Sequence, residues 1–200
     1  MENIETSIND DLSDRGTIKL VSEGINKAVS GLSGMVGRQI VVNDLSLKKM
    51  MVKEVPDLFG GPEALMVGVY LQANGYGEGH MLVGYSPETA FKLISALLGE
   101  SPQSIENLSE MEQSVLGEIG NIMGSFFLGV LADNLGTRLL PSPPAVMMDM
   151  AGAILDIPLA NMLKHGEDTF IMAATFSTPD GQIDGKFLVV PVPVIKNIYN

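Results

Sequence analysis

Apolar residues recur at helical spacing in two long stretches of the chain, one in each half. In the second half, Ser109 and Glu112 fit a capping box, in which the serine side chain accepts a hydrogen bond from a first-turn amide. Gly136 marks the expected end of that helix. A looser pattern predicts a helix over residues 17–36 in the first half. Steps of three and four residues predict that the second helix buries one apolar face, made of Met111, Val115, Ile119, Ile122, Phe126 and Val130.

Runs rich in β-branched and other apolar residues follow each long helix and predict strands. The pairs Asn74-Gly75 and Asp180-Gly181 stand where hairpin turns are expected. The predicted strands cover residues 39–47, 64–73 and 80–85 in the first half, and residues 146–155, 170–177 and 186–190 in the second.

A third, shorter helix is predicted at the end of the first half. Ser86 is its expected N-cap, Pro87 suits its first helical position, and Gly99 follows the last apolar residue of the pattern. Helices and hairpins are therefore mixed within each half. This mixture predicts an α+β fold with a central, largely antiparallel sheet and two long helices.

Short strings recur at constant offsets and indicate an internal duplication. Residues 78–87 and 184–193 share an acidic residue, Gly, Leu, Val and Pro in step, 106 positions apart. The string EGIN at 23–26 corresponds to EIGN at 118–121, 95 positions apart. Chance similarity between short apolar strings is the alternative interpretation. Two blocks in the same order favour duplication.

The duplication predicts how the chain is organised. Gly37 and Gly136 correspond at an offset of 99, so the second long helix is expected to be about one turn longer than the first. We predict a single domain over residues 15–200 with pseudo-twofold symmetry. It would consist of two repeats after an acidic N-terminal tail, with the tail at 1–14, the first repeat at about 17–99 and the second at about 107–200.

Composition and charge exclude several kinds of protein. Hydrophobic residues make up 46% of the 200 residues and charged residues 18%, which predicts a folded core rather than disorder. The formal net charge of -12 opposes binding to nucleic acid or to an anionic membrane. The chain has no cysteine, and His80 and His165 form no metal-binding motif. The acidic start and the short apolar stretch at 119–132 match neither a signal peptide nor a membrane span, so a cytoplasmic protein is expected.

A polar stripe interrupts the second long helix, which is otherwise very apolar. At roughly 100° per residue its members lie within about 60° of arc, and they are Ser114, Glu118, Asn121 and Ser125. Glycine inside a helix costs about 1 kcal/mol relative to alanine. Close approach of another backbone is therefore expected beside the stripe, at Gly117, Gly120 and Gly124.

Two interpretations of the stripe stay open on pattern alone. It is the solvated face of a helix whose glycines pack against the other long helix, or it is a surface that docks onto a partner. In the second interpretation Asn121, which both donates and accepts hydrogen bonds, could hold a water molecule, and Glu118 could pair with a cation of the partner. Because asparagine is a poor general base, such a site would position reactants rather than abstract a proton.

The stripe is part of a longer spaced pattern: Ser or Asp, three residues, Glu, two residues, Asn, 22 residues and Pro. Ser114, Glu118, Asn121 and Pro144 meet it with the full spacing. The pattern resembles the signature of the CheC/CheX/FliY phosphatases, and LGEIGNI at 116–122 is similar to the helix core of that family. The resemblance extends from about residue 17 to the end. It fits CheC best, because the chain holds two copies of the unit and no appended switch-type domain.

The resemblance implies hydrolysis of the aspartyl phosphate on the chemotaxis response regulator CheY. Glu118 and Asn121 would be the catalytic residues: Asn121 would orient a water in line with phosphorus, and Glu118 would pair with the active-site lysine of the regulator. Ser114 and Pro144 would support this site. No metal or other cofactor of the chain's own is expected, since the regulator brings its own Mg²⁺.

The expected partners follow from the same resemblance. They are phosphorylated CheY and the deamidase CheD, which CheC relatives also bind, whereas neither nucleic acid nor membrane insertion is expected. An internal pseudo-dimer favours a monomer.

The first copy departs from the family pattern. Glu23 and Asn26 are present, but Lys19 replaces the Ser or Asp, and Lys49 stands where proline is expected. Lys19 could pair with Glu23 along the helix, and it places a cation where the lysine of the regulator should arrive. We predict a degenerate second site here. A relic helix face retained for packing is the alternative.

Two other functions stay open. One is a non-catalytic chemotaxis module that sequesters CheD or phosphorylated CheY. The other is a scaffold with two helix faces and no chemistry, against which the intact spacing to Pro144 argues.

Overall fold

The computed structural model describes residues 15–75, 79–102, 104, 108–163 and 166–190. The predicted acidic tail at 1–14, the end of the second repeat at 191–200, and His165 lie outside the described residues.

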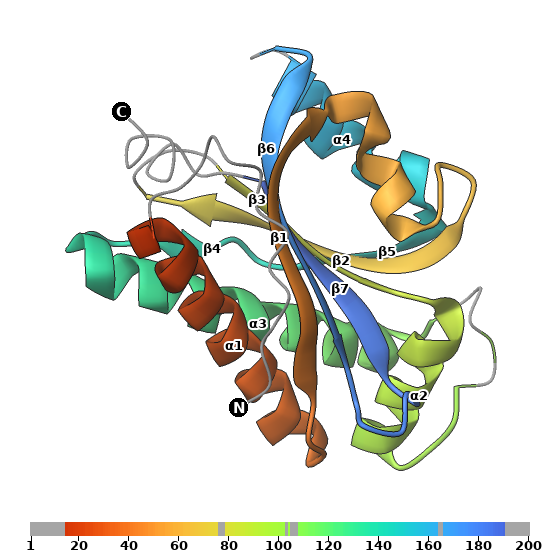
Figure 1. Cartoon of the computed structure of the whole chain (residues 1–200). Helices are drawn as coiled ribbons and strands as arrows, with labels where there is room; N and C mark the ends of the chain where they lie inside the picture. The colour runs from red at the N-terminus through yellow and green to blue at the C-terminus, as the bar shows by residue number, and fades with distance from the viewer. Residues whose placement is uncertain (1–14, 76–78, 103, 105–107, 164–165, 191–200) are drawn as a thin grey trace.

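The described residues form a seven-stranded sheet in which all paired strands are antiparallel, as predicted. The strand order is β1-β6-β7-β3-β2-β4, and β5 pairs with β2 as well (Figure 1). The strands are β1 (Val41–Met51), β2 (Leu65–Asn74), β3 (Gly79–Tyr85), β4 (Leu140–Pro141), β5 (Ala145–Met150), β6 (Asp168–Ser177) and β7 (Asp184–Val190).

Helices cover both faces of the sheet (Figure 1). The two long helices and a shorter one lie on one face, namely α1 (Arg15–Val36), α3 (Glu110–Leu135) and α2 (Pro87–Leu98). A 3-10 helix and a fourth α-helix lie on the other face, namely η2 (Val52–Phe59) and α4 (Ala151–Leu163).

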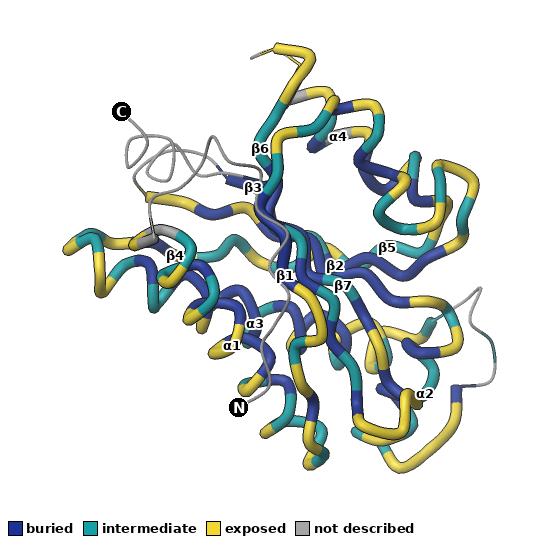
Figure 2. The backbone as a smooth tube through the Cα atoms, viewed as in Figure 1, coloured by how far each residue is buried: buried dark blue, intermediate teal, exposed yellow. Residues whose placement is uncertain are grey.

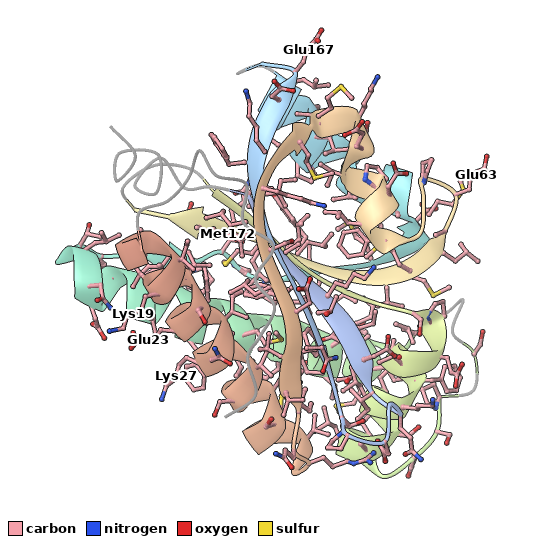
Figure 3. All side chains as sticks on the ribbon, in the orientation of Figure 1. Lys19, Glu23, Lys27, Glu63, Glu167 and Met172 are labelled. Carbon is pink, nitrogen blue, oxygen red and sulfur yellow. The ribbon has the colours of Figure 1, made fainter. Side chains whose placement is uncertain are left out.

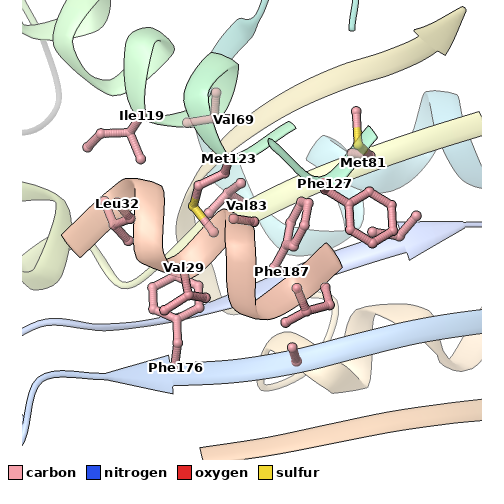
Figure 4. Packing of buried hydrophobic residues seen from close by; sticks show 14 of the residues in the cluster. Val29, Leu32, Val69, Met81, Val83, Ile119, Met123, Phe127, Phe176 and Phe187 are labelled. Carbon is pink, nitrogen blue, oxygen red and sulfur yellow. The ribbon is translucent and has the colours of Figure 1, made fainter. Parts of the chain in front are cut away.

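Strand β2 shows how the sheet separates two apolar layers. Val67, Val69 and Leu71 point toward the long helices, whereas Met66 points toward α4, because successive side chains alternate between faces. Figure 4 shows the larger layer, where residues of α1, α3 and the sheet meet. The buried part of the chain follows the sheet and the inner sides of the helices (Figure 2).

The order of elements repeats along the chain. A long helix, a strand, a short helical segment and two hairpin strands occur first as α1, β1, η2, β2 and β3, and again as α3, β5, α4, β6 and β7. In this comparison β1 corresponds to β5, β2 to β6 and β3 to β7. If each strand is replaced by its counterpart, the order of the sheet is the same order in reverse. Leu82 and Leu188, which lie 106 positions apart in the sequence, pair directly between the central strands β3 and β7. The predicted duplication requires this arrangement, and the duplication itself stays a prediction.

The predicted helix ends are confirmed. Ser86 caps α2 with its side chain, and Ser109 and Glu112 form both hydrogen bonds of a capping box at the start of α3. Gly99 and Gly136 end these helices with φ of 75° and 59°, in the left-handed region that glycine adopts without steric cost. Helix α3 has 26 residues and α1 has 22, so α3 is one turn longer, as predicted.

The predicted strand at 146–155 is wrong in its second half. Strand β5 ends at Met150, and the residues that follow form α4. Ala151, Ile154 and Leu155 are buried at helical spacing, and the backbone N–H of Ala151 donates to the carbonyl of Ala64 over 2.8 Å. Apolar residues in this run recur both at the two-residue spacing of a strand and at the three- to four-residue spacing of a helix, so the spacing alone does not distinguish the two. The 3-10 helix η2 was not predicted either.

In the predicted buried face of α3, Ile119 is confirmed as fully buried, Val115, Ile122 and Val130 are half-buried, and the other two residues are exposed. Met111 is 64% exposed and Phe126 is 42% exposed. Apolar residues lie on nearly every side of α3, so periodicity alone does not select the buried side. The side that is buried also carries the glycines, and it consists of Leu116, Gly117, Ile119, Gly120, Met123, Gly124, Phe127, Leu128 and Leu131.

Gly117, Gly120 and Gly124 of α3 face the sheet and the proline segment that follows β4, and they do not pack against the other long helix. A Cβ at position 120 would collide with Val69 of β2, and one at position 124 would lie 3.3 Å from the Cε of Met81 on β3. Side chains of the sheet, rather than another backbone, therefore occupy the space that these glycines leave.

Two glycines of α1 make the contact between the long helices. A Cβ at position 24 would lie 2.9 Å from the ring of Phe127, and one at position 31 would collide with Phe126 and lie 2.9 Å from Ile122. The residue numbers of the contacts on α3 decrease as the residue numbers on α1 increase, so the two helices run antiparallel.

Helix α3 is the one described helix that is long and apolar enough to cross a membrane by length and composition alone. The apolar stretch at 119–132, which is too short to predict a membrane span, is only part of this helix. In the structure α3 packs on the sheet and on α1, which identifies it as a core helix.

We expect Gly120→Ala to lower the free energy of unfolding by about 1–3 kcal/mol, because the added methyl group overpacks the contact with Val69. Gly129→Ala is the matched control on the same helix, since a Cβ there meets nothing within 4 Å. It should raise the free energy of unfolding by up to about 1 kcal/mol through helix propensity. Urea unfolding measures both, and equal effects would contradict the close approach of α3 to β2.

Candidate functional site

Glu118 and Asn121 lie one turn apart on the outer side of α3. The Glu118 carboxylate is exposed and Asn121 is half-buried. The Asn121 Nδ2 donates to Glu118 Oε2 over 3.3 Å. This bond orients the amide, so its carbonyl oxygen points away from Glu118 and can accept a hydrogen bond from a water molecule.

The predicted supporting residues lie on either side of this pair. Pro144, in the segment between β4 and β5, packs against α3 at Gly117, where a Cβ would lie 3.3 Å from its Cγ. The fold therefore brings Pro144 against the turn of α3 that carries Glu118 and Asn121, across the 22 intervening residues of the spaced pattern. Ser114 is exposed one turn earlier on the same helix, and Ser125 is half-buried one turn later.

Two residues that the sequence analysis missed hold the segment of Pro144 in place. The backbone N–H of Ser142 donates to the carbonyl of Gln72 over 2.8 Å, and the backbone N–H of Gln72 donates to Ser142 Oγ over 2.9 Å. These bonds tie the segment to β2, the strand on which α3 rests. The only available sequence signal was the proline-rich string PSPP at 141–144.

The charged side chains of α3 are all acidic. Helix α3 carries Glu110, Glu112, Glu118 and Asp133 and contains no Lys or Arg. Glu112 is engaged in the capping box, whereas Glu118 takes part in none of the ion pairs that the described residues form. The Glu118 carboxylate can therefore receive a cation from a partner.

The corresponding face of α1 differs in geometry. Asn26 turns its Nδ2 back to the carbonyl of Ser22 at 2.8 Å, so its donor is used within its own helix. Lys19, Glu23 and Lys27 lie in a row along the outer side of α1 (Figure 3). All three are exposed.

The charges on this α1 face are also arranged differently. Lys19 and Glu23 are not among the ion pairs of the described residues, so the pairing considered from sequence does not form. Lys27 Nζ instead lies 5.8 Å from the ring centroid of Phe126. Lys49, at the position where a proline is expected, pairs with Asp168 across β1 and β6 at 3.2 Å. No proline thus stands in that role for α1, and the degenerate second site stays a prediction.

No other cluster of the described residues competes with this site. They contain no group of three or more His, Asp or Glu side chains that could hold a metal ion. His80 Nδ1 is hydrogen-bonded to the hydroxyl of Tyr70 at 2.6 Å. Ser33 Oγ bonds to the backbone of Ile40. A hollow of about 610 Å³ lies beside α2 and the turn between β6 and β7, and no residue of the stripe lines it.

The geometry thus presents a carboxylate and an oriented amide on an open helix face, with a proline segment beside them. Such a face suits contact with a macromolecule rather than enclosure of a small molecule.

Comparison with known proteins identifies the family. The model of the CheC-like family matches residues 111–148, a range that holds all four residues of the spaced pattern. The CheY-P phosphatase CheC of Bacillus subtilis (strain 168) is 30% identical over 151 residues, which cover 74% of this chain and 72% of that protein. The chain belongs to the CheC family.

Solved structures agree with this assignment at the level of the fold. The crystal structure of FliY from Thermotoga maritima aligns with a TM-score of 0.70 at 20% identity, covering 96% of each chain. The structure of a CheX-CheY-BeF3-Mg complex from Borrelia burgdorferi aligns with a TM-score of 0.54 at 23% identity, covering 87% of this chain and 97% of that chain.

We expect Asn121→Ala to change the free energy of unfolding by less than about 0.5 kcal/mol, because its side chain lies on the outer side of α3. Ile119→Ala, two residues away and fully buried, should lower it by about 2–5 kcal/mol. Thermal or urea unfolding distinguishes the two. A large loss for Asn121→Ala would show that this residue belongs to the core.

Proposed function

We propose that the chain is a phosphatase that hydrolyses the aspartyl phosphate of the chemotaxis response regulator CheY. The observation that carries the proposal is the hydrogen-bonded pair of Glu118 and Asn121 on an exposed face, with Pro144 packed beside it. Membership of the CheC family supports it, as does the relative from Bacillus subtilis, which is a CheY-P phosphatase. The structural neighbour from Borrelia burgdorferi is a CheX bound to CheY.

Asn121 positions the attacking water in this proposal. Its carbonyl oxygen accepts a hydrogen bond from the water and directs the water oxygen in line with phosphorus. The water oxygen forms the new bond to phosphorus, the bond from phosphorus to the aspartate oxygen breaks, and the phosphate leaves with both protons of the water while the regulator recovers its ionised carboxylate. Phosphoryl transfer depends chiefly on placement and electrostatics, so an amide without basic character suffices.

Glu118 fixes the regulator with respect to Asn121. Its exposed carboxylate accepts a charge-assisted hydrogen bond from the active-site lysine of the regulator. Since Asn121 is itself bonded to Glu118, the same contact aligns the amide with the phosphoryl group. Pro144 packs against α3 at Gly117, and Ser114 borders the site.

The chain holds no cofactor of its own in this proposal. Mg²⁺ held by the regulator would neutralise charge on the phosphoryl oxygens, and the proposal assigns none of its ligands to this chain.

The proposal has a cellular setting. The protein works in the cytoplasm, where phosphorylated CheY is its substrate and CheD is a second partner, and it acts as a monomer. Glu23 and Asn26 on α1 form a weak or inactive second face, because Asn26 donates to Ser22 and Lys19 opposes an arriving lysine.

We expect Asn121→Ala to lower the rate of phosphate release from phosphorylated CheY by about 100-fold, because the water loses its positioning group. Asn26→Ala is the matched control, since it removes the same side chain from the corresponding place on α1. Its rate should stay close to that of the unaltered protein. The decay of phosphorylated CheY from the same organism, with and without each protein, measures this.

Two outcomes would contradict the proposal. A dead Asn26→Ala variant beside an active Asn121→Ala variant would place the site on α1. Binding of CheY or CheD with no acceleration of phosphate release would identify a sequestering module.

A further inference from the structure

We infer that Met111 is an apolar anchor for the docked regulator, a binding residue separate from Glu118 and Asn121. This inference rests on the proposed function. It names a specificity-determining residue that the spaced pattern does not contain.

Met111 is the most exposed large apolar side chain of the described residues, at 64%. It precedes Glu118 by seven residues, which is two helical turns, so both side chains project from the same side of α3 about 10.5 Å apart along the axis. A single exposed apolar residue is ordinary on a protein surface. Its position in line with the proposed catalytic pair is what gives Met111 a role.

The first turns of α3 extend past the end of α1. Gly31 of α1 contacts Ile122 of α3, the helices are antiparallel, and α1 ends five residues later at Val36. Five residues span about 7.5 Å, so α1 stops near the level of residue 117. A partner can therefore reach Met111 without meeting α1.

A hollow of about 560 Å³ lies next to this part of α3. Met111 and Leu98, at the end of α2, are its apolar lining residues, and the remaining lining residues are serines and glutamates. The volume is sufficient for an apolar side chain of a partner, which would lie against the thioether of Met111 and the side chain of Leu98.

The size of a protein interface makes this contact a consequence of docking at Glu118. A standard interface buries about 800 Å² on each partner, which corresponds to a disc of about 16 Å radius. Centred on Glu118, such a disc includes Met111. A regulator that brings its lysine to Glu118 thus covers Met111 as well.

The charge around Met111 specifies the partner further. Glu100 and Glu112 line the same hollow, Glu110 directly precedes Met111, and α3 has no basic residue. A matching surface is an apolar side chain ringed by Lys or Arg. This local complementarity would guide the regulator despite the net charge of -12.

The test separates binding from chemistry. Met111→Ala should raise KM for phosphorylated CheY about tenfold and leave kcat unchanged, because a thioether contributes to contact but not to water positioning. Met111→Leu, which keeps the apolar volume, should restore KM. Met51→Ala removes an exposed methionine from β1, at the opposite edge of the sheet, and should behave as the unaltered protein.

Binding is measured in parallel with CheY loaded with beryllofluoride and Mg²⁺, by titration calorimetry. Affinity should fall about tenfold for Met111→Ala and stay unchanged for Asn121→Ala. An unaltered KM and affinity in Met111→Ala, or a fall in kcat alone, would overturn the anchor and leave the phosphatase standing. If the unaltered protein neither binds nor hydrolyses, the proposed function and the anchor both fall.

Discussion

The close approach of α3 to the sheet is the constraint on which the candidate site depends. Gly120 lies against Val69, and Gly117 lies against Pro144, at places where any Cβ would collide or be tightly packed. With its glycine side pressed onto β2 and the proline segment, α3 has one rotational setting about its axis. That setting leaves Glu118 exposed and Asn121 half-buried on the outer side of the helix.

Features that depend on local chemistry could be predicted from the sequence, and features that depend on packing could not. The caps at Ser86, Ser109 and Gly136 follow from the preferences of single residues, and the structure confirms them. The buried side of α3 required knowledge of which neighbours fill the glycine positions. The helix that begins at residue 151 starts with backbone hydrogen bonds to the turn before β2, which is far away in the sequence.

The candidate site shows the same division. The spacing of Ser114, Glu118, Asn121 and Pro144 was sufficient to assemble the candidate residues, and the fold places Pro144 beside α3 as the spacing required. The sequence could not show that Asn121 bonds to Glu118 whereas Asn26 bonds to Ser22. That difference arises from side-chain orientation on two helices with nearly the same motif.

The inner and outer sides of each long helix have separate roles. Gly24 and Gly31 keep α1 in contact with α3, while Lys19, Glu23 and Asn26 lie on the outside. Outward residues can change over evolutionary time without disturbing the scaffold beneath them, whereas the inward glycines cannot. Substitutions on the outer side of one long helix can thus leave its role as a structural brace for the other unchanged.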